Sequence, residues 1–380
     1  MKNIVKLSLV ACMAISFLNA EEAKINGQIR SGYVGVDGHN EDNYATALGG
    51  MIKYESASLY DINAGFGFTT TQDVDFMSGK DDKRNEELSS AKGDYTVLGE
   101  AYLNYSNSNL NVRLGRQVVD TPLADSDDIR MVANTFEAYM ATYELPNMVL
   151  TAGNLQRFQG FDAGLDDGWV KTGEDGTWLA GLAYSSTIEL NAWFYDISKL
   201  TQAIYVDAGY THEISSDISL NVAAQYLNES EVNNSAIEAS IYGASVGVES
   251  NGLGLSLAYN NSARSDGKGS FSGFGGGTLF TSMDTMILDE ITQDSDAQAF
   301  VVGASYAISH MNLSYAYGNF TAEDSASAKE HIVEQDIILE YEVNENLALE
   351  AIYVLSSDEE SSVDTEYDFT ITQVMLKYNF

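Results

Sequence analysis

An alternation of apolar and polar residues with a period of two runs through nearly the whole chain, and it constrains the fold more than any other feature. It is clearest at the end of the chain, where Thr372, Val374, Leu376, Tyr378 and Phe380 alternate with Gln373, Met375, Lys377 and Asn379. The stretches 187–196 and 345–356 repeat the pattern. Successive side chains of a strand point to opposite faces, so each such segment predicts a β-strand with one apolar and one polar face.

Eighteen segments of this kind can be placed along the chain. We expect strands near 25–37, 43–54, 57–70, 94–106, 108–118, 135–144, 147–157, 176–185, 187–196, 201–213, 216–228, 236–249, 251–262, 297–308, 310–321, 331–343, 345–356 and 365–380. Eight of the connections between them are tight turns. The other nine are mostly longer and often charged or rich in glycine, and they cover 38–42, 71–93, 119–134, 158–175, 197–200, 229–235, 263–296, 322–330 and 357–364.

These numbers match one architecture. An all-β transmembrane antiparallel barrel of about 18 strands, with both termini on one side, needs eight short periplasmic turns and nine long extracellular loops. A soluble β-sandwich of this length would need several domains, and no linker divides the chain. A solenoid would need a fixed repeat, and none is present. Beyond the N-terminus no run of ~18 apolar residues predicts a membrane-spanning helix.

The first twenty residues have the pattern of a secretory signal peptide. Lys2 and Lys6 flank the start of a mostly apolar run that ends at Leu18, and Ala20 precedes an acidic pair. We therefore divide the chain into a signal peptide, 1–20, and a single barrel domain, 21–380. The only cysteine, Cys12, lies in the apolar run. It formally resembles a lipoprotein cleavage site, but the apolar run continues past it, which favours an ordinary signal peptide.

The charge of the chain excludes one class of partner and helps to orient the strands. A formal net charge of -37 excludes a protein that binds nucleic acid through a broad basic surface. A Lys or Arg on the lipid face at mid-membrane costs ~2–4 kcal/mol, so an isolated charge within a strand should face the lumen. We therefore place Arg30 inward with Asn26 and Gln28, and Arg113 inward with Asn111.

The same argument gives the other candidate pore-lining charges of the strands. They are Arg116, Arg157, Asp61, Glu100, Glu334 and Asp336, with the faces of Arg116 and Arg157 left open because both lie near strand ends. Solvation of a wet lumen explains most of these charges. The sharper hypothesis is a basic stripe from the N-terminal third of the chain that faces an acidic wall from the C-terminal third.

Two of the long loops are expected to fold toward the pore. Loop 119–134 carries Ile129, Met131 and Val132, which are too apolar for a free surface loop. In loop 263–296 a glycine-rich tip precedes apolar residues at helical spacing, which predicts a short helix at the barrel mouth. The charged residues of the first loop that we place at the pore are Asp120, Asp125, Asp127, Asp128 and Arg130.

Cofactors and catalysis have weak support in the sequence. Oxygen ligands of the kind that Ca²⁺ prefers are offered by Asp125, Asp127 and Asp128. The spacing and the glycine of an EF-hand are missing, however, so we interpret these residues as solvated acids. No cofactor is expected. The four histidines lack zinc-protease spacing and there is no Gly-x-Ser-x-Gly motif, so we do not expect an enzyme. A barrel enzyme assembled across strands and a surface adhesin remain as alternatives. A plugged receptor of 22 strands would need a longer chain.

One stretch resembles a known family. Its motifs are Gly115-Arg116-Gln117, Thr121-Pro122-Leu123, Asp128 with Arg130, and Thr135-Phe136-Glu137. In these motifs the chain resembles the OprD-like outer-membrane porins, and most of all the acidic major porins of the epsilon-proteobacteria. The resemblance implies an 18-strand barrel whose third loop enters the pore. It also implies a ladder of basic residues that guides carboxylate solutes, onto which Arg116 and Arg130 map. The run 231–235 matches a bacterial N-glycosylation acceptor of the type found in these relatives, with Asn233 as the acceptor, but the more common meaning of such a run is a polar outer loop.

Together these observations predict a porin of the Gram-negative outer membrane. We expect a passive diffusion channel for ions and small hydrophilic solutes with weak cation preference, and a channel selective for carboxylate solutes as the alternative. We expect outer-membrane lipid and lipopolysaccharide to surround it. Its oligomeric state could be a monomer or a homotrimer. Tyr378 and Phe380 resemble the terminal signal that the barrel-assembly machinery recognises.

Overall fold

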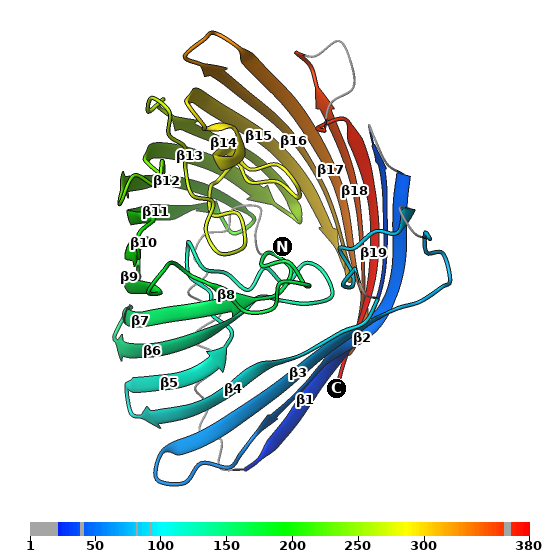
Figure 1. Cartoon of the computed structure of the whole chain (residues 1–380). Coiled ribbons are helices and arrows are strands. Elements are labelled where there is room, and N and C mark those ends of the chain that lie inside the picture. Colours follow the sequence, from blue (N-terminus) through cyan, green and yellow to red (C-terminus); the bar gives the residue numbers. More distant parts are fainter. Residues whose placement is uncertain (1–21, 39–41, 81–82, 92, 361–365) are drawn as a thin grey trace.

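The chain forms a closed antiparallel β-barrel (Figure 1). The computed structural model describes residues 22–38, 42–80, 83–91, 93–360 and 366–380. Its strands are β1 Lys24–Gly38, β2 Asp42–Glu55, β3 Ile62–Asp73, β4 Tyr95–Asn107, β5 Leu110–Gln117, β6 Thr135–Leu145, β7 Met148–Gln159, β8 Val170–Lys171, β9 Thr177–Ser185, β10 Ile188–Ile197, β11 Thr201–Ser215, β12 Ile218–Glu231, β13 Ala239–Ser250, β14 Leu253–Ser262, β15 Ser295–Ile308, β16 Met311–Asp324, β17 Lys329–Asn344, β18 Leu347–Asp358 and β19 Phe369–Asn379. The predicted signal peptide and Cys12 lie outside the described residues.

Eighteen of these strands make the wall. The two-residue β8 pairs only with the end of β7, and β7 pairs directly with β9. The barrel closes where β1 pairs with β19, from Gln28 opposite Asn379 to Gly38 opposite Phe369. A 3-10 turn, η4 Leu288–Ile291, lies in the long loop between β14 and β15. Among the described residues no helix is long and apolar enough to span a membrane. The predicted fold class is therefore confirmed.

The largest error in the predicted strands is the start of the third one. We expected it at residue 57, but β3 begins at Ile62. Tyr60 and Asp61 have φ values of 52° and 64°, a left-handed conformation that a strand does not contain. Asp61 therefore lies in the turn before β3, where its carboxylate accepts a hydrogen bond from Asn107 Nδ2 at 2.6 Å. Its predicted place on the lumen face of a strand was wrong.

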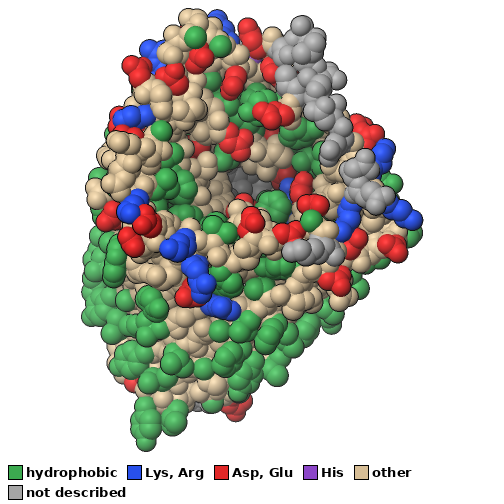
Figure 2. Space-filling model, in the orientation of Figure 1, with side chains coloured by type: hydrophobic (Ala, Val, Ile, Leu, Met, Phe, Trp, Pro, Cys, Tyr) green, Lys and Arg blue, Asp and Glu red, His purple; other side chains and the backbone are tan. Residues whose placement is uncertain are grey.

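The two faces of the wall differ as the alternation indicates. On β1, Ile29 is 50% exposed on the outside while Arg30 is 3% exposed on the inside. On β19, Leu376 and Tyr378 are exposed, whereas Gln373 is buried. Figure 2 shows hydrophobic side chains over the lower outer surface, with acidic and basic side chains gathered around the upper rim and a central hollow. This is the arrangement of a wall with lipid outside and a polar lumen inside.

Three long loops lie against the inner wall. Leu88 of loop 74–94 and Met131 of loop 118–134 are fully buried in one apolar cluster with residues of β1, β2, β18 and β19. Leu123 of loop 118–134 and Leu288 of loop 263–294 belong to a second cluster on the opposite strands. Since a barrel of eighteen strands has room for solute, these loops decide how much of the lumen stays open.

Candidate functional site

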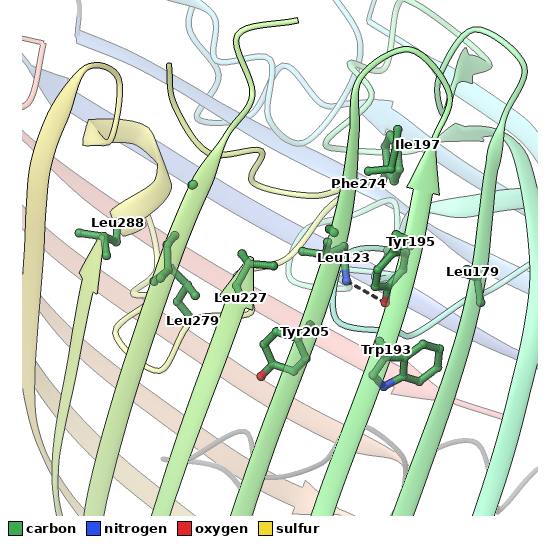
Figure 3. Packing of buried hydrophobic residues seen from close by; sticks show 14 of the residues in the cluster. Leu123, Leu179, Trp193, Tyr195, Ile197, Tyr205, Leu227, Phe274, Leu279 and Leu288 are labelled. Atoms are coloured by element: carbon green, nitrogen blue, oxygen red, sulfur yellow. Dashed lines mark hydrogen bonds between the residues drawn. The ribbon is translucent and has the colours of Figure 1, made fainter. Parts of the chain in front are cut away.

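Loops 118–134 and 263–294 are joined to each other inside the barrel. Phe274 donates its backbone N–H to the Leu123 carbonyl at 2.9 Å, and its own carbonyl accepts the Asp125 N–H at 3.3 Å. The Phe274 ring packs edge-on against Phe158 of β7, with ring centres 5.4 Å apart. Figure 3 shows Leu123 beside Tyr195, whose hydroxyl accepts the Leu123 N–H at 3.3 Å. Apolar packing and backbone hydrogen bonds thus fix both loops together.

Buried acids of the wall hold loop 263–294 in place. Asp336 on β17 accepts the backbone N–H of Asp284 at 3.1 Å, and Glu334 accepts the backbone N–H of Thr285 at 3.0 Å. On β12, Glu229 accepts the Ser270 hydroxyl at 2.8 Å. Glu334 and Asp336, two of the acids predicted to line the pore, therefore accept hydrogen bonds that hold this loop against the wall.

Arg130 of loop 118–134 contacts two other loops. Its Nε lies 3.1 Å from Glu87 of loop 74–94, and its Nη2 lies 3.6 Å from Asp284 of loop 263–294. Its guanidinium also lies 5.6 Å from the centre of the Phe161 ring. The side chain is 4% exposed, and Nη1 has no hydrogen-bond partner.

Arg30 fixes the same loop from the wall. Its Nη1 and Nη2 bind the two carboxylate oxygens of Asp128 at 2.5 and 2.6 Å. Nη1 also donates to the Arg130 carbonyl oxygen at 2.7 Å. Because both terminal nitrogens of the guanidinium are engaged in this bidentate pairing, Arg30 anchors loop 118–134 and is not a free pore charge.

A second basic group lies on the N-terminal wall. The Arg113 guanidinium lies 4.4 Å from the centre of the Tyr102 ring, and that of Arg116 lies 4.5 Å from the centre of the Trp169 ring. Arg157 binds Glu137 at 2.5 Å and is the second arginine over Trp169, at 5.9 Å. The structure thus brings Arg116 and Arg157 together on one aromatic ring.

Glu100, the remaining predicted acid of the N-terminal wall, also has a basic partner. It binds Lys53 Nζ at 2.9 Å. Glu55 lies 3.8 Å from the same Lys53 Nζ. The three acids Glu55, Glu100 and Glu137 thus stand against the four cations Lys53, Arg113, Arg116 and Arg157, so this group keeps a small excess of positive charge.

A cavity of about 990 Å³ lies between the loops and the C-terminal wall. Among the described residues, its acidic lining side chains are Glu87, Asp127, Asp162, Asp284, Glu290, Asp336, Glu340 and Glu350, and its basic one is Arg130. Burial raises the pKa of Asp284, and the Arg130 charge opposes that shift. Oδ1 of Asp336 is buried without a hydrogen-bond partner. The lining therefore favours positive charge.

The other predicted loop acids mainly order their own loop. Asp125 Oδ1 accepts the Asp127 N–H at 2.7 Å, and Asp120 Oδ1 accepts the Ser126 N–H at 3.1 Å. With Asp128 engaged by Arg30, the three aspartates considered for Ca²⁺ do not form a common cluster. In the described part of the chain no three acidic, His or Cys side chains converge to hold a metal ion.

The last residues of the chain complete the seam of the barrel. Phe380 and Gly27 exchange two backbone hydrogen bonds of 3.0 Å each. A Cβ at Gly27 would lie 2.6 Å from the Phe380 ring, so the ring sits on the bare backbone of Gly27. Tyr378, opposite Ile29, projects to the outside and is 44% exposed.

Three residues of the site were missed by sequence reasoning. Glu87 and Asp284 contact Arg130, and Trp169 contacts two arginines. All three lie in loops, where no alternation shows which way a side chain points. Leu88, an isolated apolar residue in an acidic stretch, was the one signal that loop 74–94 packs inward.

Comparisons with known proteins agree with the barrel fold. A family model described as "outer membrane porin, OprD family" matches residues 20–380. No curated protein sequence matches the chain significantly. Among solved structures, OccAB4 of Acinetobacter baumannii has a TM-score of 0.80 at 16% identity, covering 94% of this chain and 98% of that one. OpdK of Pseudomonas aeruginosa, solved with vanillate, has a TM-score of 0.78 at 16% identity, covering 96% and 100%. At this identity the structural likeness shows the fold alone.

Proposed function

The chain belongs to the OprD family of outer-membrane porins, and from this premise we propose that it is a passive diffusion channel for ions and small hydrophilic solutes with a weak preference for cations. The lining of the central cavity carries this proposal, because eight acidic side chains and one arginine line it among the described residues. A lumen lined by one sign of charge concentrates ions of the opposite sign.

The proposal extends to the surroundings of the channel. We infer a leader, 1–20, that is removed on export, contact of the apolar outer face with lipid and lipopolysaccharide, and insertion by the barrel-assembly machinery. The formal charge of -37 suits a place among the acidic major porins of the epsilon-proteobacteria.

Reversal potentials across a planar bilayer in a salt gradient test the selectivity. We expect cation preference that is strongest at low salt, because the Debye length is ~30 Å at 0.01 M and ~8 Å at 0.15 M. Replacing Arg130 with Ala should raise the preference, since it removes the one basic side chain of the described cavity lining and leaves Glu87 and Asp284 unpaired. Chloride preference of the wild-type channel at low salt would contradict the proposal.

A second candidate function is supported by the N-terminal wall. Arg113, Arg116 and Arg157 lie over Tyr102 and Trp169, a surface suited to an aromatic carboxylate. The similar structure of OpdK was solved with vanillate, an aromatic carboxylate.

Selectivity for carboxylates predicts that vanillate permeates more readily than chloride in bi-ionic bilayer measurements. Replacing Arg116 with Gln should lower the permeability ratio of vanillate to chloride severalfold, because it removes one of the two cations over Trp169. Lys199, which lies outside this wall and pairs with Glu174, provides the matched control as Lys199→Gln. Equal ratios in all three channels would reject this second function.

A further inference from the structure

Arg130 connects three loops that are far apart in the sequence. Glu87 comes from loop 74–94, Arg130 from loop 118–134 and Asp284 from loop 263–294. The two carboxylates bind different nitrogens of one guanidinium, at 3.1 and 3.6 Å. The wall residue Arg30 holds the Arg130 carbonyl at 2.7 Å, so both the backbone and the side chain of Arg130 are fixed.

Arg130 and Asp284 are buried, and Glu87 is partly exposed. The Arg130 side chain is 4% exposed, that of Asp284 8% and that of Glu87 27%. Removing one partner of a buried pair leaves an uncompensated charge, which is strongly destabilising. A guanidinium that loses a carboxylate here must therefore turn toward the water of the cavity or move with its loop.

We propose that Glu87 and Asp284 are positioning residues that clamp Arg130 across the lumen and thereby set both the opening of the constriction and its charge selectivity. The clamp consists of Glu87, Arg130 and Asp284. It rests on the proposed channel function, and it assigns loop 74–94 to the constriction. While the clamp is closed, two acids mask the Arg130 charge and three loops stay together.

Glu340 provides a matched control for the charge of Glu87. Both carboxylates line the cavity, but Glu340 accepts a hydrogen bond from Asn312 Nδ2 at 2.8 Å and has no recorded contact with Arg130. Glu87→Gln and Glu340→Gln each remove one negative charge. Only Glu87→Gln also removes a partner of Arg130. It leaves the Arg130 charge less compensated and breaks the ion pair that joins loop 74–94 to loop 118–134.

Single-channel recordings and reversal potentials of these variants test the clamp. We expect Glu87→Gln to lower the permeability ratio of sodium to chloride more than Glu340→Gln does. Each variant removes one negative charge, but only Glu87→Gln also allows the Arg130 guanidinium to turn toward the water of the cavity. We also expect added open-channel noise in Glu87→Gln and Asp284→Asn. In an Arg130→Gln background, Glu87→Gln should have no more effect than Glu340→Gln.

The variant Arg130→Lys distinguishes the effect of the charge at residue 130 from the effect of holding that charge in one position. Lysine keeps the charge but lacks the planar fork that reaches two carboxylates, so it should give noisy channels with reduced cation preference. Heat-modifiable migration on gels confirms that each variant folds. Equal effects of Glu87→Gln and Glu340→Gln, or a quiet Arg130→Lys channel, would overturn the clamp. A wild-type protein that conducts nothing would instead overturn the channel function itself.

Discussion

Replacing Phe380 with Asp, or deleting it, is expected to lower the amount of folded barrel in the outer membrane on the order of tenfold. Deletion removes both backbone hydrogen bonds between Phe380 and Gly27, worth about 1 kcal/mol net each, from the seam that closes the barrel. Substitution by Asp removes the ring that covers Gly27 and puts a charge on the outer face. An open edge cannot satisfy its backbone groups in lipid.

Quantifying the heat-modifiable barrel in outer-membrane fractions checks this prediction. Phe380→Tyr is the control, because it keeps an aromatic ring over Gly27 and the same backbone pairing, and it should insert like the wild type. Normal abundance of Phe380→Asp would show that β1 and β19 close the barrel without the terminal residue, and that the terminal signal lies elsewhere.

Raising the pH through about 7 is expected to loosen loop 263–294. Burial raises the pKa of Asp289 from 3.8 to about 7, while a hydrogen bond with Ser270 opposes the shift and the charge of Glu290 adds to it. Asp289 lies in η4, and its Oδ1 has no hydrogen-bond partner. Glu229 of β12, which accepts hydrogen bonds from Ser270 and Phe271, adds a further acid beside it.

The sign of the effect follows from the direction of this shift. A raised pKa means that the folded loop binds the proton more tightly than the unfolded chain does, so the protonated carboxyl stabilises the packed loop. That contribution is fully present below pH 3.8 and is lost as the pH rises through about 7.

Single-channel recordings at pH 5.5 and 8.5 test the expectation. The wild type should show more frequent current fluctuations at the higher pH, and Asp289→Asn, which cannot ionise, should reduce that difference. Asp266→Asn is the control, because Asp266 lies in the same loop with a side chain that is 90% exposed. The idea fails if Asp289→Asn keeps the pH dependence of the wild type.

The wall of the barrel could be predicted from the sequence because each strand carries its own signal. Alternation placed Arg30 and Asn111 inside and Ile29 and Leu114 outside without reference to any distant residue. Errors occurred where the backbone leaves the strand conformation, as at Asp61, since a left-handed φ in a non-glycine residue leaves little trace in the sequence.

The site required the tertiary structure. Arg130 was expected at the pore, but its partners Glu87 and Asp284 lie in two other loops, and Trp169 lies in a fourth. The sequence by itself determined the number of strands, their faces and the acidic excess of the chain, because these depend on local periodicity and composition. Only the tertiary structure decided which charges meet, because loop packing depends on contacts between distant segments that no local pattern records.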